Sequence, residues 1–233
     1  MKINIIGDIA GRYDELMLLL DKMPEADLIL SVGDLVDRGS QSKEVIQWFM
    51  DTENADAVYG NHEDLFVNGI IHRDTFNWIQ NGGGATLRSY IELGPGEEIE
   101  DKTINDVHVP QEHMQWLQTR PMYFQTDNLF VSHAPVISLK SIPADPLSRN
   151  ELFIWNRYEP RKPQDKYMIY GHNGQFKRHK WGDGTEFAMC LDNSHSGRLT
   201  GAHWDGDKVT EIFSVDFPDR DDHPGYYHNI IAE

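Results

Sequence analysis

The stretch INIIGDIAGRYDEL, residues 3–16, decides the fold class of this chain. An apolar run rich in isoleucine ends at Gly7-Asp8, and a helical pattern begins two residues after Ala10. A short apolar strand followed directly by a helix predicts the first half of a βαβ unit. The stretch also raises a question of chemistry, because an acid at the end of a strand is either part of a site or an ordinary turn residue.

Strand and helix patterns keep alternating through the first quarter of the chain. The expected helices lie at 12–23 and 40–50, and the expected strands at 28–32 and 55–59. Ser40 or Ser42 is available as the N-cap of the second helix. Strands separated by helices of this length predict parallel pairing and an α/β fold.

The middle of the chain has weaker signals, after which β patterns return. Strands are expected at 128–133, 166–172, 186–192, 198–204 and 208–215. A short helix between prolines is expected at 110–121, and the glycine-rich segment 81–86 is expected to be a loop. Residues 94–106 are typical of an exposed acidic connection, and 218–233 of an irregular tail. No repeat or linker divides the sequence, so we expect a single domain spanning residues 1–233.

The composition excludes several classes of protein. The chain has 233 residues, and its formal charge of −17 opposes binding to nucleic-acid phosphates but suits divalent cations. No apolar run approaches the ~20 residues that span a bilayer, and no secretory signal is evident, so a cytoplasmic protein without membrane contact is expected. A single cysteine, Cys190, excludes a disulfide framework and a thiolate metal cluster; we expect it to be a buried packing residue.

Five of the expected strands end in residues that can bind a metal ion. These residues are Asp8, Asp34, Asn61, His133 and His172. A glycine precedes four of them, and glycine allows sharp turns and close approach of the backbone. Because groups beyond the carboxyl ends of parallel strands converge on one crevice, we expect the five side chains to meet.

The types of ligand indicate which metals and which chemistry to expect. Carboxylates, an amide oxygen and imidazoles suit manganese, with iron, zinc, cobalt or nickel as alternatives, better than calcium. A carboxylate that bridges two such ions ~4 Å apart is typical of sites that activate a shared hydroxide and neutralise a phosphoryl group. The pattern therefore predicts two divalent metal ions and phosphoester hydrolysis.

Several motifs resemble those of the calcineurin-like metallophosphoesterases. They are GDIAG (7–11), GDLVDRG (33–39), GNHED (60–64), SHAP (132–135) and YGHN (170–173). The second and third together resemble the phosphoprotein phosphatase branch, and WIQNGGGAT (78–86) and FIWNR (153–157) resemble its phage lambda and bacterial members. The resemblance implies a four-layer αββα sandwich, in which two mixed β-sheets are flanked by helices.

The resemblance also implies a role for each metal-binding candidate. Asp8 would bind the first metal, and Asp34 would bridge both. Asn61, His133 and His172 would complete the second metal site.

Four further residues receive catalytic roles from the resemblance. His62 would donate a proton to the leaving oxygen, and Asp37 would orient it and keep it protonated. Arg38 and Arg157 would hold the phosphate oxygens, as planar guanidinium groups are suited to do.

One position departs from the family pattern. The first motif of the family is Gly-Asp-x-His-Gly, and Ala10 stands where its metal-binding histidine is expected. Either the chain is a natural, divergent member, or histidine was replaced by alanine to disable it. In both cases we expect a weakened first metal site and impaired activity.

Three functions remain open on the sequence. The first is a protein phosphatase, either specific for serine and threonine or of broad specificity, acting on a phosphorylated protein or a small phosphoester. The second is hydrolysis of dinucleoside polyphosphates or cyclic nucleotides, and the third is a catalytically dead pseudophosphatase that only binds phosphate. Asp37 favours monoester chemistry over the second, because relatives that cleave symmetric dinucleoside tetraphosphates tend to have alanine there. A proton donor such as His62 would have no use in the third.

Overall fold

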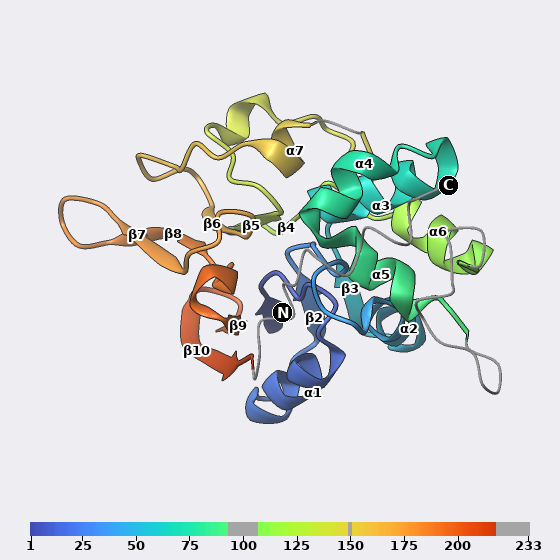
Figure 1. Ribbon diagram of the computed structural model, residues 1–233. Helices are drawn as coiled ribbons and strands as arrows, with labels where there is room; N and C mark the ends of the chain where they lie inside the picture. The colour runs from blue at the N-terminus through green and yellow to red at the C-terminus, as the bar shows by residue number, and fades with distance from the viewer. Residues whose placement is uncertain (93–106, 149–150, 218–233) are drawn as a thin grey trace.

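The computed structural model describes residues 1–92, 107–148 and 151–217. The acidic connection predicted at 94–106 and the irregular tail predicted at 218–233 lie outside these residues. The described chain forms two five-stranded sheets with helices around them (Figure 1).

The first sheet contains the N-terminal strands and the last two strands. Its order is β10-β9-β1-β2-β3. The bounds are β1 Ile3–Ile6, β2 Leu28–Ser31, β3 Ala55–Ala57, β9 Arg198–Trp204 and β10 Val209–Asp216. β1, β2 and β3 are parallel, as predicted, whereas β9 and β10 run antiparallel to their neighbours.

The second sheet has the order β4-β5-β6-β8-β7. The bounds are β4 Tyr123–Gln125, β5 Leu129–Ser132, β6 Tyr167–Tyr170, β7 Lys177–Lys180 and β8 Glu186–Cys190. β5, β6 and β8 are parallel, and β4 and β7 are antiparallel edge strands. These two edge strands were not expected from the sequence.

Side chains that alternate along the strands build the two faces of each sheet. Ile3 and Ile5 of β1 pack with Leu129 and Val131 of β5 in a core between the sheets. Phe130, between those last two residues, packs in a separate core on the outer face of the second sheet. Because apolar side chains alternate between the two faces of a strand, one face of each sheet packs against the other sheet. The opposite, outer face of each sheet must then be covered by other elements.

Helices cover the outer face of the first sheet. The helical bounds are α1 Tyr13–Lys22, α2 Ser42–Asp51, α3 Asn61–His72, α4 Thr75–Trp78, η1 Ile79–Gly83, α5 Gly84–Ser89, α6 Gln111–Gln118, η4 Leu139–Ser141, α7 Leu152–Trp155 and η5 Ser194–Ser196. Leu16 and Leu19 of α1 pack with Val45 and Phe49 of α2 in the core under this layer. The short helix α7 lies over the second sheet, and Figure 1 shows it on the side away from α1 and α2. The αββα arrangement expected from the resemblance is confirmed.

Two local predictions were wrong. The N-cap of α2 is Gln41, without a side-chain cap, because the Ser42 hydroxyl instead accepts the backbone N–H of Asp37. The segment 81–86 is not one continuous loop: helical residues lie on both sides of a kink at Gly82, whose φ is 101°. Gly83 packs so closely on the Trp78 indole that a side chain there would collide with the ring. This tertiary contact outweighs the weak helical propensity of glycine.

Cys190 is buried in the outer core of the second sheet, which confirms its predicted packing role. Among the described residues, no helix has the length and apolar character needed to cross a membrane.

Candidate active site

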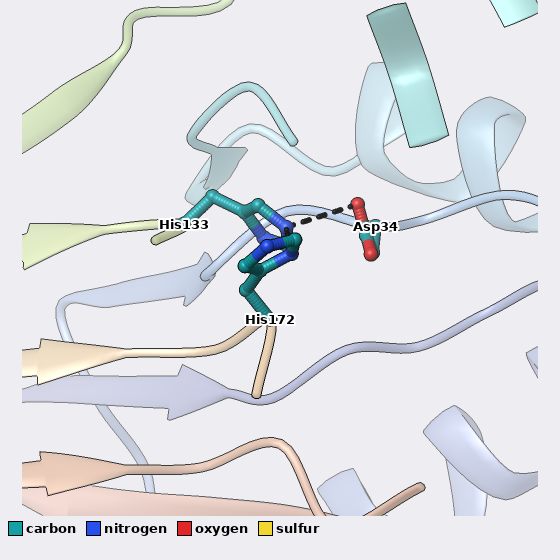
Figure 2. A group of neighbouring side chains, drawn as sticks. All are labelled: Asp34, His133 and His172. Atoms are coloured by element: carbon teal, nitrogen blue, oxygen red, sulfur yellow. Dashed lines mark hydrogen bonds and ion pairs between the residues drawn. The ribbon is translucent and has the colours of Figure 1, made fainter. Parts of the chain in front are cut away.

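The carboxyl ends of the parallel strands of both sheets bring the predicted metal-binding residues together. Asp8, Asp34 and Asn61 follow β1, β2 and β3, and His133 and His172 follow β5 and β6. Asp34, His133 and His172 offer ligand atoms that all lie within 4.8 Å of one another. Figure 2 shows these three side chains pointing toward one another from three separate segments.

The imidazole of His133 lies at the centre of this group. Its Nε2 is 2.8 Å from Asn61 Oδ1, 3.2 Å from His172 Nδ1 and 3.3 Å from Asp34 Oδ1. Its Nδ1 lies 3.0 Å from the carbonyl oxygen of Val32, which can only accept, so Nδ1 carries the proton. Burial lowers the pKa of His133, which keeps the ring neutral and leaves Nε2 with a lone pair.

Lone pairs therefore converge where Asp34, Asn61, His133 and His172 meet. Burial, and then the neighbouring His133, lower the pKa of His172 to about 3, so this ring is also neutral. Its Nε2 is buried and has no hydrogen-bond partner within the described residues. Such a set of acceptors repels itself unless a cation lies among it, and the oxygen and nitrogen donors match a borderline divalent metal. The residues present fit a metal ion.

Asp8 lies beside this group but does not join it. Its carboxylate accepts the backbone N–H of His172 at 3.1 and 3.3 Å. Burial, and then the charges of Asp192 and Asp34, raise the pKa of Asp8 well above its ordinary value. A cation beside Asp8 would offset this repulsion, so the carboxylate also fits a metal.

Ala10 occupies the position that departs from the family pattern. It is buried, its N–H donates to the backbone oxygen of Asp34 at 2.8 Å, and its own carbonyl accepts the N–H of Gly39 at 2.9 Å. Its methyl group supplies no ligand. Asp8 and Asp34 are therefore the carboxylates available for a first metal, whereas the second site has four convergent groups.

His62 and Asp37 form the shortest side-chain pair of the site. His62 Nδ1 lies 2.6 Å from Asp37 Oδ2, and Trp78 Nε1 and Thr86 Oγ1 donate to Asp37 Oδ1 at 2.9 and 2.7 Å. Burial alone would lower the pKa of His62, but the charges of Asp34 and Asp37 outweigh it and raise that pKa. Because Nδ1 is engaged by Asp37, Nε2 is the position from which His62 can give a proton.

Each of the two predicted arginines contacts one histidine of the site. Arg38 Nη2 is 3.2 Å from His62 Nε2, and Arg157 Nη1 donates to the backbone oxygen of His172 at 2.9 Å. All nine predicted site residues thus gather around the same strand ends.

Unusual backbone conformations also cluster here. Ala10, Asp34, Asp37, Arg38 and His172 all adopt positive φ, between 51° and 72°. Non-glycine residues seldom adopt this left-handed conformation, and it persists where the surrounding structure imposes it. Strain of this kind concentrated at one site indicates function.

The predicted role of the glycines is only partly seen. Gly33 does have a positive φ, of 96°. Gly171 instead packs against the Asp8 carboxylate, where a Cβ would collide, and a Cβ on Gly7 would collide with the backbone oxygen of Leu191. Close packing thus explains two of these glycines.

Sequence reasoning missed four residues that support the site. Glu63 is buried, and its carboxylate accepts N–H groups of Asp34, Leu35 and Gly60, on both loops that carry ligands. The others are Trp78, Thr86 and Asp192. Asp192 follows β8 directly after Leu191 and could have been found by the strand-end pattern used for the other ligands.

Comparison with known sequences decides the family. A family model described as calcineurin-like phosphoesterase matches residues 1–196. The chain belongs to this family. Membership of the calcineurin-like phosphoesterases supports a metal-dependent hydrolase of phosphoesters.

Curated relatives of the family carry two kinds of name. The chain is 32% identical over 150 residues to a bis(5'-nucleosyl)-tetraphosphatase PrpE of Geobacillus, covering 58% of this chain and 57% of the relative. It is 34% identical over 116 residues to serine/threonine-protein phosphatase 2 of Escherichia coli, covering 46% of this chain and 49% of the relative. The chain spans about half the length of these relatives, which fit the phosphoprotein phosphatase branch.

Solved structures share the fold. A crystal structure of a protein assigned as a diadenosine tetraphosphatase superposes with a TM-score of 0.64, at 17% identity and with 93% of each chain covered. At this identity the likeness shows the arrangement of the two sheets and nothing about the substrate.

Proposed function

We propose that this chain is a metal-dependent phosphomonoesterase of broad specificity that removes phosphate from proteins, with phosphoserine and phosphothreonine as its first substrates. The observation that carries the proposal is the 2.6 Å contact between His62 Nδ1 and Asp37 Oδ2. An alcohol is a poor leaving group and needs a proton as its bond to phosphorus breaks. A histidine whose pKa is raised by two carboxylates suits that need.

Asp34, Asn61, His133 and His172 would hold one divalent ion, and Asp8 with Asp34 the other, with manganese the metal to test first. When bound, such a pair stabilises charge on the phosphoryl oxygens and lowers the pKa of water. Asp34 would be the shared ligand, since its Oδ1 faces His133 and its charge also acts on Asp8.

The remaining residues would act on the substrate. Arg38 and Arg157 would orient the phosphate, because each has guanidinium N–H groups beyond the single contact described above. His62 would then protonate the leaving oxygen from Nε2. Asp37 would hold the ring orientation and stabilise the imidazolium form.

The test compares leaving groups in the variant His62→Asn. With Mn²⁺, turnover of a phosphoserine peptide should fall by about 10²–10⁴-fold, the contribution of a general acid. Turnover of p-nitrophenyl phosphate, whose leaving group is a weak base, should fall much less. Equal losses on both substrates would show that His62 is not the proton donor to the leaving group. If the unaltered chain turned over neither substrate, the result would favour a pseudophosphatase that only binds phosphate.

A second candidate is hydrolysis of dinucleoside polyphosphates, which the names of the bis(5'-nucleosyl)-tetraphosphatase relatives, both PrpE and symmetrical, favour. The leaving group of such a substrate is itself a phosphate and needs little protonation. If this is the function, the unaltered chain should turn over a bis(5'-nucleosyl) tetraphosphate faster than a phosphoserine peptide, and His62→Asn should retain most of that turnover.

A further inference from the structure

Trp155 is an aromatic side chain at the edge of the site that none of the proposed chemistry uses. It ends α7, whose Phe153 and Ile154 are buried in the outer core of the second sheet. The Trp155 side chain is instead 39% exposed. The burial of its two neighbours fixes the helix and leaves the indole outside the core.

The indole lies directly beside a candidate metal ligand. Its ring centroid is 6.1 Å from that of His172, and the rings meet edge to face at 86°. The His172 ring is in turn 5.0 Å from the His133 ring. Trp155 therefore borders the place where the phosphoryl group would bind.

The turn after Trp155 is held firmly. Asn156 Nδ2 donates to the backbone oxygen of Pro135 at 2.6 Å, and Asn156 Oδ1 accepts the N–H of Tyr158 at 3.2 Å. On the far side of Asn156, Arg157 donates to the backbone of His172. An aromatic ring and a cation are thus fixed on either side of one asparagine, both in contact with His172.

We propose that Trp155 is a specificity-determining residue that packs against a planar aromatic group carried by the phosphoester. The inference rests on the proposed phosphomonoesterase function of broad specificity, in which Arg157 orients the phosphate. It adds that phosphoesters with a planar aromatic group bind more tightly than phosphoserine or phosphothreonine, because their organic group covers the indole. An exposed indole gains most when a flat apolar group covers it. The aromatic group could be a phenol ring joined to the phosphate or the base of a nucleotide.

Binding measurements with matched ligands test the proposal. With the Mn²⁺-loaded chain, calorimetry compares benzylphosphonate with cyclohexylmethylphosphonate, which has the same carbon skeleton but no planar ring. It also compares the non-hydrolysable 5′-methylenephosphonate analogues of AMP and of ribose 5-phosphate. We expect the planar ligand of at least one pair to bind about 2- to 10-fold tighter, the range of one aromatic contact.

The variant Trp155→Leu should abolish that preference, whereas Trp155→Phe should retain most of it. Trp181→Leu is the matched control, because Trp181 is also an exposed tryptophan, at 49%, and lies away from the site in the turn between β7 and β8. If the preference is lost for the benzyl pair, the aromatic group is a phenol-type ring; if it is lost for the nucleotide pair, the group is a nucleotide base. An unchanged preference in Trp155→Leu for both pairs would overturn the proposal.

Two further readouts separate the possible failures. Orthophosphate should bind Trp155→Leu as it binds the unaltered chain; if it binds neither, the proposed function itself fails. In the unaltered chain labelled with 5-fluorotryptophan, benzylphosphonate or the methylenephosphonate analogue of AMP should shift the ¹⁹F resonance that is missing from Trp155→Phe. A resonance that moves with neither ligand would contradict the contact without depending on the folding of Trp155→Leu.

Discussion

The side chains of Asp37, in the loop after β2, and His62, in the first turn of α3, meet at 2.6 Å, and both are buried. The second carboxylate oxygen of Asp37 is fully engaged by Trp78 and Thr86. The direction of the Asp37 carboxylate is therefore fixed by groups other than His62, which makes it a preorganised support for the imidazolium.

Asp37→Asn should leave less of His62 protonated without disturbing the metal-binding residues. Since the Asp37 charge helps to raise the pKa of His62, its removal lowers that pKa. The acid must be protonated, so the fall of kcat with rising pH should move to lower pH, and kcat on a phosphoserine peptide should drop by about 10². A pH profile of kcat checks this. Asp127→Asn, which removes an exposed carboxylate, should leave the profile unchanged; an unmoved alkaline limb in Asp37→Asn would contradict the dyad.

Ala10→His should restore a ligand to the first metal site. The position has a φ of 51°, a conformation that histidine adopts more readily than most residues. We expect the manganese content to rise from about one to about two ions per chain and turnover to rise at least 10-fold, the lower bound for lost metal contacts. Equilibrium dialysis and a p-nitrophenyl phosphate assay measure both. Ala10→Leu adds bulk without a ligand atom and should gain neither; equal gains in the two variants would rule out coordination as the cause.

Glu63→Gln should loosen two ligand-bearing loops together. Its carboxylate accepts three backbone N–H groups. In glutamine an NH₂ group replaces one of these oxygens, and because it is itself a donor it cannot accept a hydrogen bond from the backbone. Leaving such groups unpaired costs about 1–3 kcal/mol, so the midpoint of urea unfolding should fall. The Kd for Mn²⁺ should also rise, since Asp34 and Asn61 lie on these loops. Glu112→Gln, on the first turn of α6, is the control, and tight Mn²⁺ binding by a destabilised Glu63→Gln would contradict the coupling.

His113 should make the fold sensitive to acid. It is buried between the Tyr90 hydroxyl, 2.8 Å from Nδ1, and the Gln47 amide oxygen, 2.9 Å from Nε2. Burial lowers the pKa of His113 below that of the unfolded chain, about 6.5. The unfolded state therefore takes up protons first, so this contribution to stability is present above pH 6.5 and is lost as the pH falls below it. His113→Gln should show a smaller loss of unfolding free energy between pH 7.5 and 5.5; parallel losses would show that His113 does not contribute.

The sequence was sufficient to predict the strand ends, because each ligand follows its own apolar strand within a few residues. The pattern is local. Parallel pairing brings Asp8 and Asp34 to one edge of the first sheet and His133 and His172 to one edge of the second, and the packing of the two sheets then brings these edges together. Asp192 obeys the same rule, since it follows β8 within two residues, so the sequence could have placed it at this edge of the second sheet as well.

The support of Asp37 could not be predicted in this way. Trp78 and Thr86 lie 41 and 49 residues further along the chain, and the contacts exist only after α4 and η1 pack on α3 and α5 packs on α2. The same packing makes a helix of a glycine-rich segment, since Gly69 and Gly83 must lack side chains where they touch Trp78. Propensity alone assigns such a segment to a loop.

The metal-binding histidines and the residues that hold Asp37 come from parts of the fold that differ in rigidity. His133 and His172 follow strands in the middle of a sheet, whereas the hydrogen bonds to Asp37 Oδ1 come from short helical pieces joined by a kink at Gly82. Partial opening of these helical pieces would release the acid while the metal ligands stay in register. Backbone amides of 79–86 should accordingly exchange with deuterium sooner than those of β5 and β6, and mild heating should abolish turnover before it releases the metal.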